Sequence, residues 1–213
     1  MAKEIKSLIA GYKKFKQHYF DEQNPLFDEL VRGGQKPDIL IIGCSDSRVD
    51  PAIVTNCLPG ELFVIRNVAN LVPPYEEDNA YHGTSAALEF GVCVLGVKHI
   101  IVFGHNQCGG IMSLFEKSQT TSVKKGFVSK WMEIAKPTYE AVIKQGDGLP
   151  LQDQLDMCGQ NSIVSSLRNL RTFPWIRDTE AKGDLVLHGW YFDLMTGIIK
   201  SFDSEKNAFV ELD

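Results

Sequence analysis

Two short motifs carry side chains that together could bind a transition metal. The first is Cys44-Ser-Asp-Ser-Arg48 and the second is Gly104-His-Asn-Gln-Cys-Gly-Gly110. Thiolates and imidazoles are the soft and borderline donors that Zn²⁺ prefers. Three protein ligands, here Cys44, His105 and Cys108, leave a fourth tetrahedral position for water, as in a catalytic zinc site. Either residue alone is better explained as a buried cysteine or a loop histidine, but the two motifs together favour a metal site.

A possible acid–base element lies inside the first motif. Asp46 and Arg48 are two residues apart, and a carboxylate paired with a guanidinium stays ionised and fixed in orientation. Such a group could accept a hydrogen bond from a water molecule on the metal. The alternative is a structural ion pair in which Asp46 caps the next helix.

Two other chemistries are excluded by spacing. Capture of a phosphate by a thiolate needs a longer loop than the three residues between Cys44 and Arg48. A dinucleotide site needs a G-x-G-x-x-G turn after the first strand, and this turn lacks it.

Short apolar runs alternate with helical patterns along the chain, which predicts an α/β fold with a mostly parallel central sheet and helices on both faces. We expect a strand order of about 2-1-3-4 and an antiparallel edge strand. The predicted strands are 38–43, 62–65, 99–103, 184–191 and 198–202. The predicted helices are 25–31, 84–95, 109–117, 127–145 (disturbed at Pro137) and 152–170.

These elements place both motifs where chemistry is expected. Cys44 directly follows the first strand and His105 lies just past the third. In open α/β sheets, ligands bind outside the carboxyl ends of the strands, at the point where the strand order reverses. If the two strands are neighbours there, the motifs meet in one crevice.

The chain reads as a single domain, 1–213, with neither internal repeats nor a linker. Its first 34 residues form an amphipathic helical arm whose apolar stripe must cover its own core or a partner subunit. The stripe consists of Ile5, Leu8, Ile9, Tyr12, Phe15 and Tyr19.

Composition limits the partners and the compartment. The net charge of −5 gives no basic footprint, so we expect neither nucleic acid nor membrane as a partner. The amino-terminal segment has scattered charges, unlike a secretory signal. Five cysteines form no dense disulfide framework, which favours free thiols and a cytoplasmic location. Cys57, Cys93 and Cys158 lack a nearby histidine or second cysteine and are expected to pack in the core.

Three segments carry a family resemblance. The two motifs above and Arg66-Asn-Val-Ala-Asn70 resemble the signature of β-class carbonic anhydrases, and the resemblance runs from about Pro25 to His188-Gly-Trp-Tyr191. It implies reversible hydration of carbon dioxide to bicarbonate and a proton by zinc-bound hydroxide, with one Zn²⁺ per chain.

The resemblance also implies a role for each motif residue. Cys44, His105 and Cys108 would bind the zinc ion. Asp46 and Arg48 would form a catalytic dyad beside the fourth ligand position.

Substrate-binding residues follow from the same resemblance, which implies a narrow apolar pocket at a dimer interface. Gln35 would reach substrate from the partner subunit, and the backbone N–H of Gly109 would face a substrate oxygen. Phe63, Val68 and Phe90 match pocket-lining positions, although ordinary core packing explains these three equally well. The implied assembly is a homodimer or a dimer of dimers.

Two positions bear on how the site works. Members whose aspartate closes on zinc characteristically carry a tryptophan where this chain has Ile41, and 71–75 is similar to members whose site stays open. We therefore expect water as the fourth ligand. Some relatives carry a histidine at the position of Val94, and valine cannot shuttle protons.

Two rival functions remain. A hydrolase of carbonyl sulfide or carbon disulfide would use the same ligands on the same scaffold. A non-catalytic zinc-binding or bicarbonate-binding module would need neither Gln35 nor the pairing of Asp46 with Arg48.

Overall fold

The computed structural model describes residues 2–21, 24–78, 80–116 and 126–212. The chain forms two compact units, 1–36 and 37–213, which are described separately.

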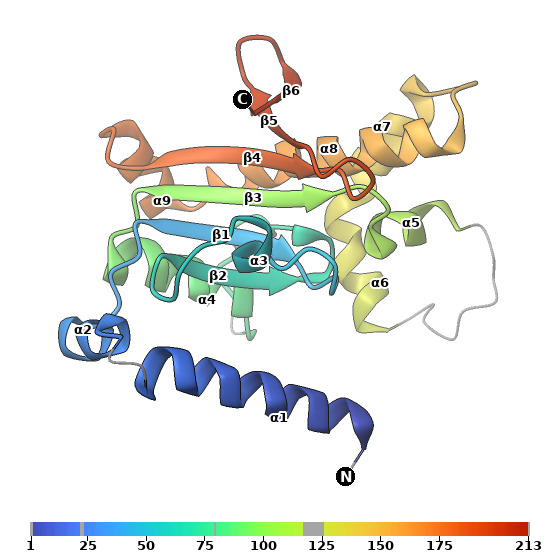
Figure 1. The fold of residues 1–213 in the computed structure, drawn as a ribbon. Coiled ribbons are helices and arrows are strands. Elements are labelled where there is room, and N and C mark those ends of the chain that lie inside the picture. Colours follow the sequence, from blue (N-terminus) through green and yellow to red (C-terminus); the bar gives the residue numbers. More distant parts are fainter. Residues whose placement is uncertain (1, 22–23, 79, 117–125, 213) are drawn as a thin grey trace. The chain divides into compact units, whose positions relative to one another are not determined.

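The larger unit is built on a six-stranded sheet with the order β2-β1-β3-β4-β5-β6 (Figure 1). The first four strands in this order are parallel, and β5 and β6 are antiparallel additions. The predicted order 2-1-3-4 with an antiparallel edge is therefore confirmed, although β6 was not predicted. The strands are β1 (Ile39–Cys44), β2 (Leu62–Asn67), β3 (His99–His105), β4 (Val186–Phe192), β5 (Ile199–Asp203) and β6 (Ala208–Glu211).

Helices connect the strands, and five of them lie where the sequence predicts helix. The helices of this unit are α3 (Pro51–Val54), α4 (Gly83–Glu89), α5 (Gly109–Phe115), α6 (Phe127–Met132), α7 (Lys136–Gln145), α8 (Leu151–Leu170) and α9 (Pro174–Ala181). The sequence analysis missed α3 and α9, which are four and eight residues long. Helix α3 spans barely one turn, and the two large apolar residues of α9, Trp175 and Ile176, are adjacent rather than at helical spacing.

The segment 127–145, predicted as one helix disturbed at Pro137, forms two helices, α6 and α7. A 3₁₀ turn at Glu133–Ala135 separates α6 from α7, and Pro137 lies in the first turn of α7. Proline is tolerated there because the first backbone N–H groups of a helix have no partner within the helix.

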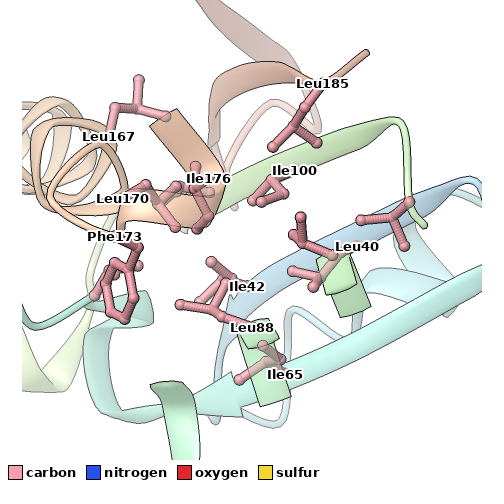
Figure 2. Close-up of a cluster of buried hydrophobic side chains, with 14 of the residues drawn as sticks. Leu40, Ile42, Ile65, Leu88, Ile100, Leu167, Leu170, Phe173, Ile176 and Leu185 are labelled. Atoms are coloured by element: carbon pink, nitrogen blue, oxygen red, sulfur yellow. The ribbon is translucent and has the colours of Figure 1, made fainter. Parts of the chain in front are cut away.

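Both faces of β1 and β3 are buried, which explains their continuous apolar runs. Leu40, Ile42 and Ile100 point to one face and pack against α4, α8 and α9 (Figure 2). Ile41 and Ile101 point to the other face, where α3 contributes Val54. The first cluster includes the labelled residues Leu88, Leu167, Leu170, Phe173, Ile176 and Leu185.

Two glycines, Gly104 on β3 and Gly189 on β4, let Ile163 of α8 pack closely on the sheet. A Cβ atom at Gly104 would lie 2.8 Å from Cδ1 of Ile163, and one at Gly189 would lie 2.7 Å from Cγ2 of the same residue. Ile163 is fully buried in α8. A larger side chain at position 104 would therefore push α8 away from His105, the next residue.

The amino-terminal unit consists of α1 (Lys3–Lys16), a π-helical turn (Gln17–Asp21) and α2 (Leu26–Gly33). Phe15 and Tyr19 contact Phe27 across this unit, with ring centroids 5.5 and 5.4 Å apart. None of the described residues in α1 or α2 is buried.

Within the described part of the chain, every helix is too short or too polar to cross a membrane.

Candidate active site

The carboxyl ends of β1 and β3 bring the two motifs together. Cys44 ends β1 and His105 ends β3, and these strands are hydrogen-bonded neighbours. The Sγ atoms of Cys44 and Cys108 are 3.8 Å apart, and the ligand atoms of all three residues lie within 4.8 Å of one another. All three side chains are buried. Two thiols and an imidazole are thus held around a single point.

The imidazole of His105 has one satisfied nitrogen and one that lacks a partner. Its Nδ1 lies 2.7 Å from the carbonyl oxygen of Asn106, so Nδ1 carries the proton and donates to that oxygen. Its Nε2 is buried and has no hydrogen-bond partner among the described residues. A buried polar atom without a partner is costly, and a metal ion would satisfy this lone pair. The donor set therefore fits zinc.

The two thiols influence each other's ionisation. A hydrogen bond from the Cys108 thiol and the neighbouring His105 lower the pKa of Cys44 to about 4, against the effect of burial. The hydrogen bond to Cys44, burial and the charge of the Cys44 thiolate together raise the pKa of Cys108. The protein alone thus stabilises one thiolate, and ionisation of the second thiol requires a nearby cation.

The loop carrying His105 and Cys108 is fixed by its intervening residues. The side chain of Asn106 donates to Oδ1 of Asp193 at 2.8 Å and accepts from the backbone N–H of Leu194 at 2.9 Å. Gln107 has a left-handed backbone, with φ of 53°, and its carbonyl accepts from Nη2 of Arg48 at 3.2 Å. The turn after β4 and the first motif therefore both support this loop.

Asp46 and Arg48 form a two-pronged ion pair. Nε and Nη2 of Arg48 donate to the two carboxylate oxygens at 3.0 and 2.7 Å, and the backbone N–H of Arg48 adds a third bond at 3.0 Å. The guanidinium holds the pKa of Asp46 well below its usual range. Asp50, and not Asp46, caps α3 through the N–H of Ala52. The alternative in which Asp46 serves as a helix cap is therefore wrong.

The predicted pocket-lining residues fall into two places. Val68 packs against the cluster that contains Cys44 and Cys108. Phe63 packs against the other core cluster and stacks on Phe90, with ring centroids 5.9 Å apart.

Phe90 and Gly109 are exposed in this chain, and Gly109 directly follows the candidate ligand Cys108. Gln35 is exposed and lies after α2 in the amino-terminal unit. The substrate-binding roles of these residues stay predictions.

The remaining cysteines behave differently from one another. Cys158 is fully buried in α8, as expected. Cys93 is exposed and Cys57 only partly buried, so the expectation of core packing was wrong for Cys93. The expectation rested on the absence of a nearby histidine or second cysteine, which does not determine the direction of the side chain, and Cys93 lies in a π-helical turn, Phe90–Leu95.

Comparison with known proteins agrees with this geometry. A family model described as carbonic anhydrase matches residues 39–199. The chain is 32% identical over 194 residues to beta carbonic anhydrase 3 of Arabidopsis thaliana, covering 91% of this chain and 74% of that protein. The chain belongs to the β-class carbonic anhydrase family. Members of the family are carbonate dehydratases, which are lyases.

Other relatives extend the agreement. A carbonic anhydrase of Synechocystis is 37% identical over 206 residues, covering 97% of this chain and 74% of that protein. The solved β-carbonic anhydrase CcaA is 36% identical, with a TM-score of 0.90 over 98% of this chain and 100% of the other. A tetrameric β-carbonic anhydrase of Sordaria macrospora is 31% identical, with a TM-score of 0.78 over 93% of this chain and 94% of the other.

Sequence reasoning missed the residues that hold the ligand loops. Arg66 and Asn106 lie inside the quoted motifs, but neither was given a role. Arg66 donates to backbone carbonyls of the first motif, and Asn106 supports the second. Their partners Asp50 and Asp193 carry no motif signal, because each contact depends on how the chain folds back.

We predict that Cys108→Ser will lose zinc. The substitution removes a ligand, so zinc affinity should fall by at least the roughly 10- to 100-fold that loss of an outer-shell partner costs. Metal content after dialysis against a chelator measures this effect. Cys93→Ser, at an exposed thiol, is the control and should keep the wild-type zinc content. Wild-type zinc retention by Cys108→Ser would contradict the assignment.

Proposed function

We propose that this chain hydrates carbon dioxide reversibly to bicarbonate and a proton, with one Zn²⁺ held by Cys44, His105 and Cys108. The observation that carries the proposal is the buried Nε2 of His105, which has no partner among the described residues and lies beside a thiol pair. The ion pair of Asp46 and Arg48 follows Cys44 on the same loop.

Zinc at this site would supply a Lewis acid that lowers the pKa of water, so that a nucleophile exists near neutral pH. Asp46 is the acceptor that orients the attacking water. Because Arg48 holds the pKa of Asp46 so low, Asp46 is a weak base that would not take up the proton of the water. It would act by accepting a hydrogen bond. The released proton therefore leaves by another route, to buffer or to solvent, and Val94 gives it no relay.

The carboxylate of Asp46 is held by Arg48 rather than left free to close on the metal. Three hydrogen bonds from one residue fix both of its oxygens. We therefore assign this chain to the members whose fourth ligand position stays open to water.

Substrate would be bound by residues near the ligand loops. Val68 contributes an apolar wall beside the thiol cluster, and the N–H of Gly109 would donate to a substrate oxygen. We include Phe63, Phe90 and Gln35 in the pocket on family resemblance, with Gln35 contributed by a partner subunit.

The protein would act as a homodimer or a dimer of dimers in the cytoplasm. The stripe of α1 supports an assembly, because it exposes large apolar side chains, including Leu8 at 71% and Tyr12 at 61%. Apolar surface of this kind marks protein–protein contacts. The arm at 1–34 would pack on a partner subunit.

Replacing either member of the dyad should abolish most of the turnover while zinc stays bound. Asp46→Ala removes the carboxylate that accepts the hydrogen bond from water, and Arg48→Ala removes the side-chain hydrogen bonds that orient this carboxylate. Each should therefore lower kcat by the roughly 100- to 10,000-fold typical of a positioned acid–base group. Stopped-flow hydration of carbon dioxide, together with metal analysis, measures both quantities.

The exposed pair Arg177–Asp178 is the matched control for the dyad. Arg177→Ala and Asp178→Ala should leave kcat unchanged. Normal turnover in Asp46→Ala would remove that residue from the mechanism.

The open site predicts fast hydration at neutral as well as at alkaline pH. Because Arg48 holds both carboxylate oxygens of Asp46, the metal position stays accessible across this range. Stopped-flow assays of zinc-loaded protein at the two pH values test this prediction. Activity confined to alkaline pH would instead indicate that Asp46 closes on the metal.

The assembly should depend on the stripe of α1. Leu8→Asn loses about 1.5–3 kcal/mol of burial per copy, and with two copies the dimer should be weakened by about a hundredfold or more. Sedimentation over a range of concentrations measures the dissociation constant. Lys6→Asn, also exposed on α1, is the control and should not change it. Equal constants for both variants would place the interface elsewhere.

A further inference from the structure

Arg66 joins three separate parts of the first ligand loop. It lies on β2, where its backbone is paired with Gly43 of β1. Its Nε donates to the carbonyl of Cys44 at 3.0 Å, and its Nη2 donates to the carbonyl of Asp46 at 2.7 Å. The two carbonyls belong to the metal ligand and to the dyad carboxylate residue.

The third arm of the guanidinium is fixed by a carboxylate. Nη1 of Arg66 donates to Oδ2 of Asp50 at 2.6 Å, while Oδ1 of Asp50 caps α3 by accepting from Ala52 N at 3.0 Å. Asp50 thus orients Arg66 and anchors the next helix at once.

The close approach of α3 depends on Gly43. A Cβ atom at this position would lie only 3.0 Å from Cγ of Pro51, the first residue of α3. The absence of a side chain there lets α3 lie against β1, and this places Asp50 within reach of Arg66.

The geometry requires an arginine. A planar guanidinium presents its N–H groups in a rigid fork, so three acceptors can be held in fixed relative positions. A lysine ammonium in the same place could reach an acceptor, but it would not fix the spacing between two carbonyls two residues apart.

We propose that Arg66 is a positioning residue for the reaction: it sets the conformation of the Cys44–Arg48 loop, so that Asp46 is presented to the metal site. The proposal rests on the proposed function. Arg48 controls the side chain of Asp46, and Arg66 controls its backbone. The two arginines therefore hold the same residue from different ends.

A purely structural ion pair is the competing explanation. The side chains of Arg66 and Asp50 keep 28% and 35% of their exposure, and pairs this accessible contribute little to stability. Arg171 and Glu180 form another partly exposed pair, with side-chain exposures of 48% and 27% and hydrogen bonds of 2.9 and 2.7 Å, and it joins the end of α8 to α9, away from the loop. It therefore provides a matched control.

The test compares Arg66→Gln, Arg66→Lys, Asp50→Asn and Arg171→Gln in the zinc-loaded full-length protein. Arg66→Gln should lower kcat by about 10- to 100-fold, as loss of an outer-shell partner does, with KM changed by less than about threefold. Arg66→Lys should recover part of the loss. Asp50→Asn should have a smaller effect, because both carbonyl contacts remain. Arg171→Gln should behave as wild type.

A second measurement does not depend on activity. In cobalt-substituted protein the visible absorption bands report ligand geometry, and Arg66→Gln should shift them while Arg171→Gln should not. If Arg66→Gln fails to fold, Arg66→Lys and Asp50→Asn are judged by the same two measurements.

The proposal is overturned if the Arg66 variants keep wild-type kcat and cobalt spectra, or if Arg171→Gln loses as much activity as Arg66→Gln. Failure of the proposed function looks different. Wild-type protein would then bind metal without hydrating carbon dioxide, while the cobalt spectra would still show whether Arg66 positions the loop.

Discussion

The structure depends on the parallel pairing of β1 with β3. The pairing sets Gly43 beside Phe103, so the residues that follow, Cys44 and Gly104-His105, emerge together at the carboxyl edge of the sheet. No local motif could bring Cys44 to His105, because the two residues are far apart in the chain. The apolar faces of the two strands, buried against α4, α8 and α9 on one side, hold that register and with it the distances between the thiols and the imidazole.

Charge balance around the ligand loops explains why two arginines are needed. Asp46 and Asp50 place two carboxylates at this edge of the sheet, close to the Cys44 thiol, whose pKa is lowered. Arg48 and Arg66 compensate that charge. Each does so through a direct, hydrogen-bonded ion pair rather than through long-range electrostatic attraction. Arg48 also reaches the carbonyl of Gln107, so it links the two ligand loops directly.

The sequence was sufficient for what depends on local pattern. Five strands followed from apolar runs. The expected order of the parallel four is confirmed, and with β1 and β3 as neighbours the rule for strand ends brings the two motifs together. The edge strand β6 and the helices α3 and α9 were missed, because β6 and α3 have only four residues each and the large apolar residues of α9 are adjacent rather than at helical spacing. The supporting contacts of Arg66 and Asn106 could not be predicted, because their partners Asp50 and Asp193 become neighbours only through folding.

The supporting contacts bear on what kind of metal site this is. A structural site needs its ligands fixed and nothing more, and the carbonyl of Asn106 already fixes the ring of His105. Here additional hydrogen bonds from Arg48 and Arg66 go to Asp46, which is not among the three metal-ligand candidates. Holding a non-ligand carboxylate this firmly costs side-chain entropy and adds little to metal affinity. It is the arrangement expected where the carboxylate must meet a reacting molecule in one orientation, which favours a catalytic centre over a binding module.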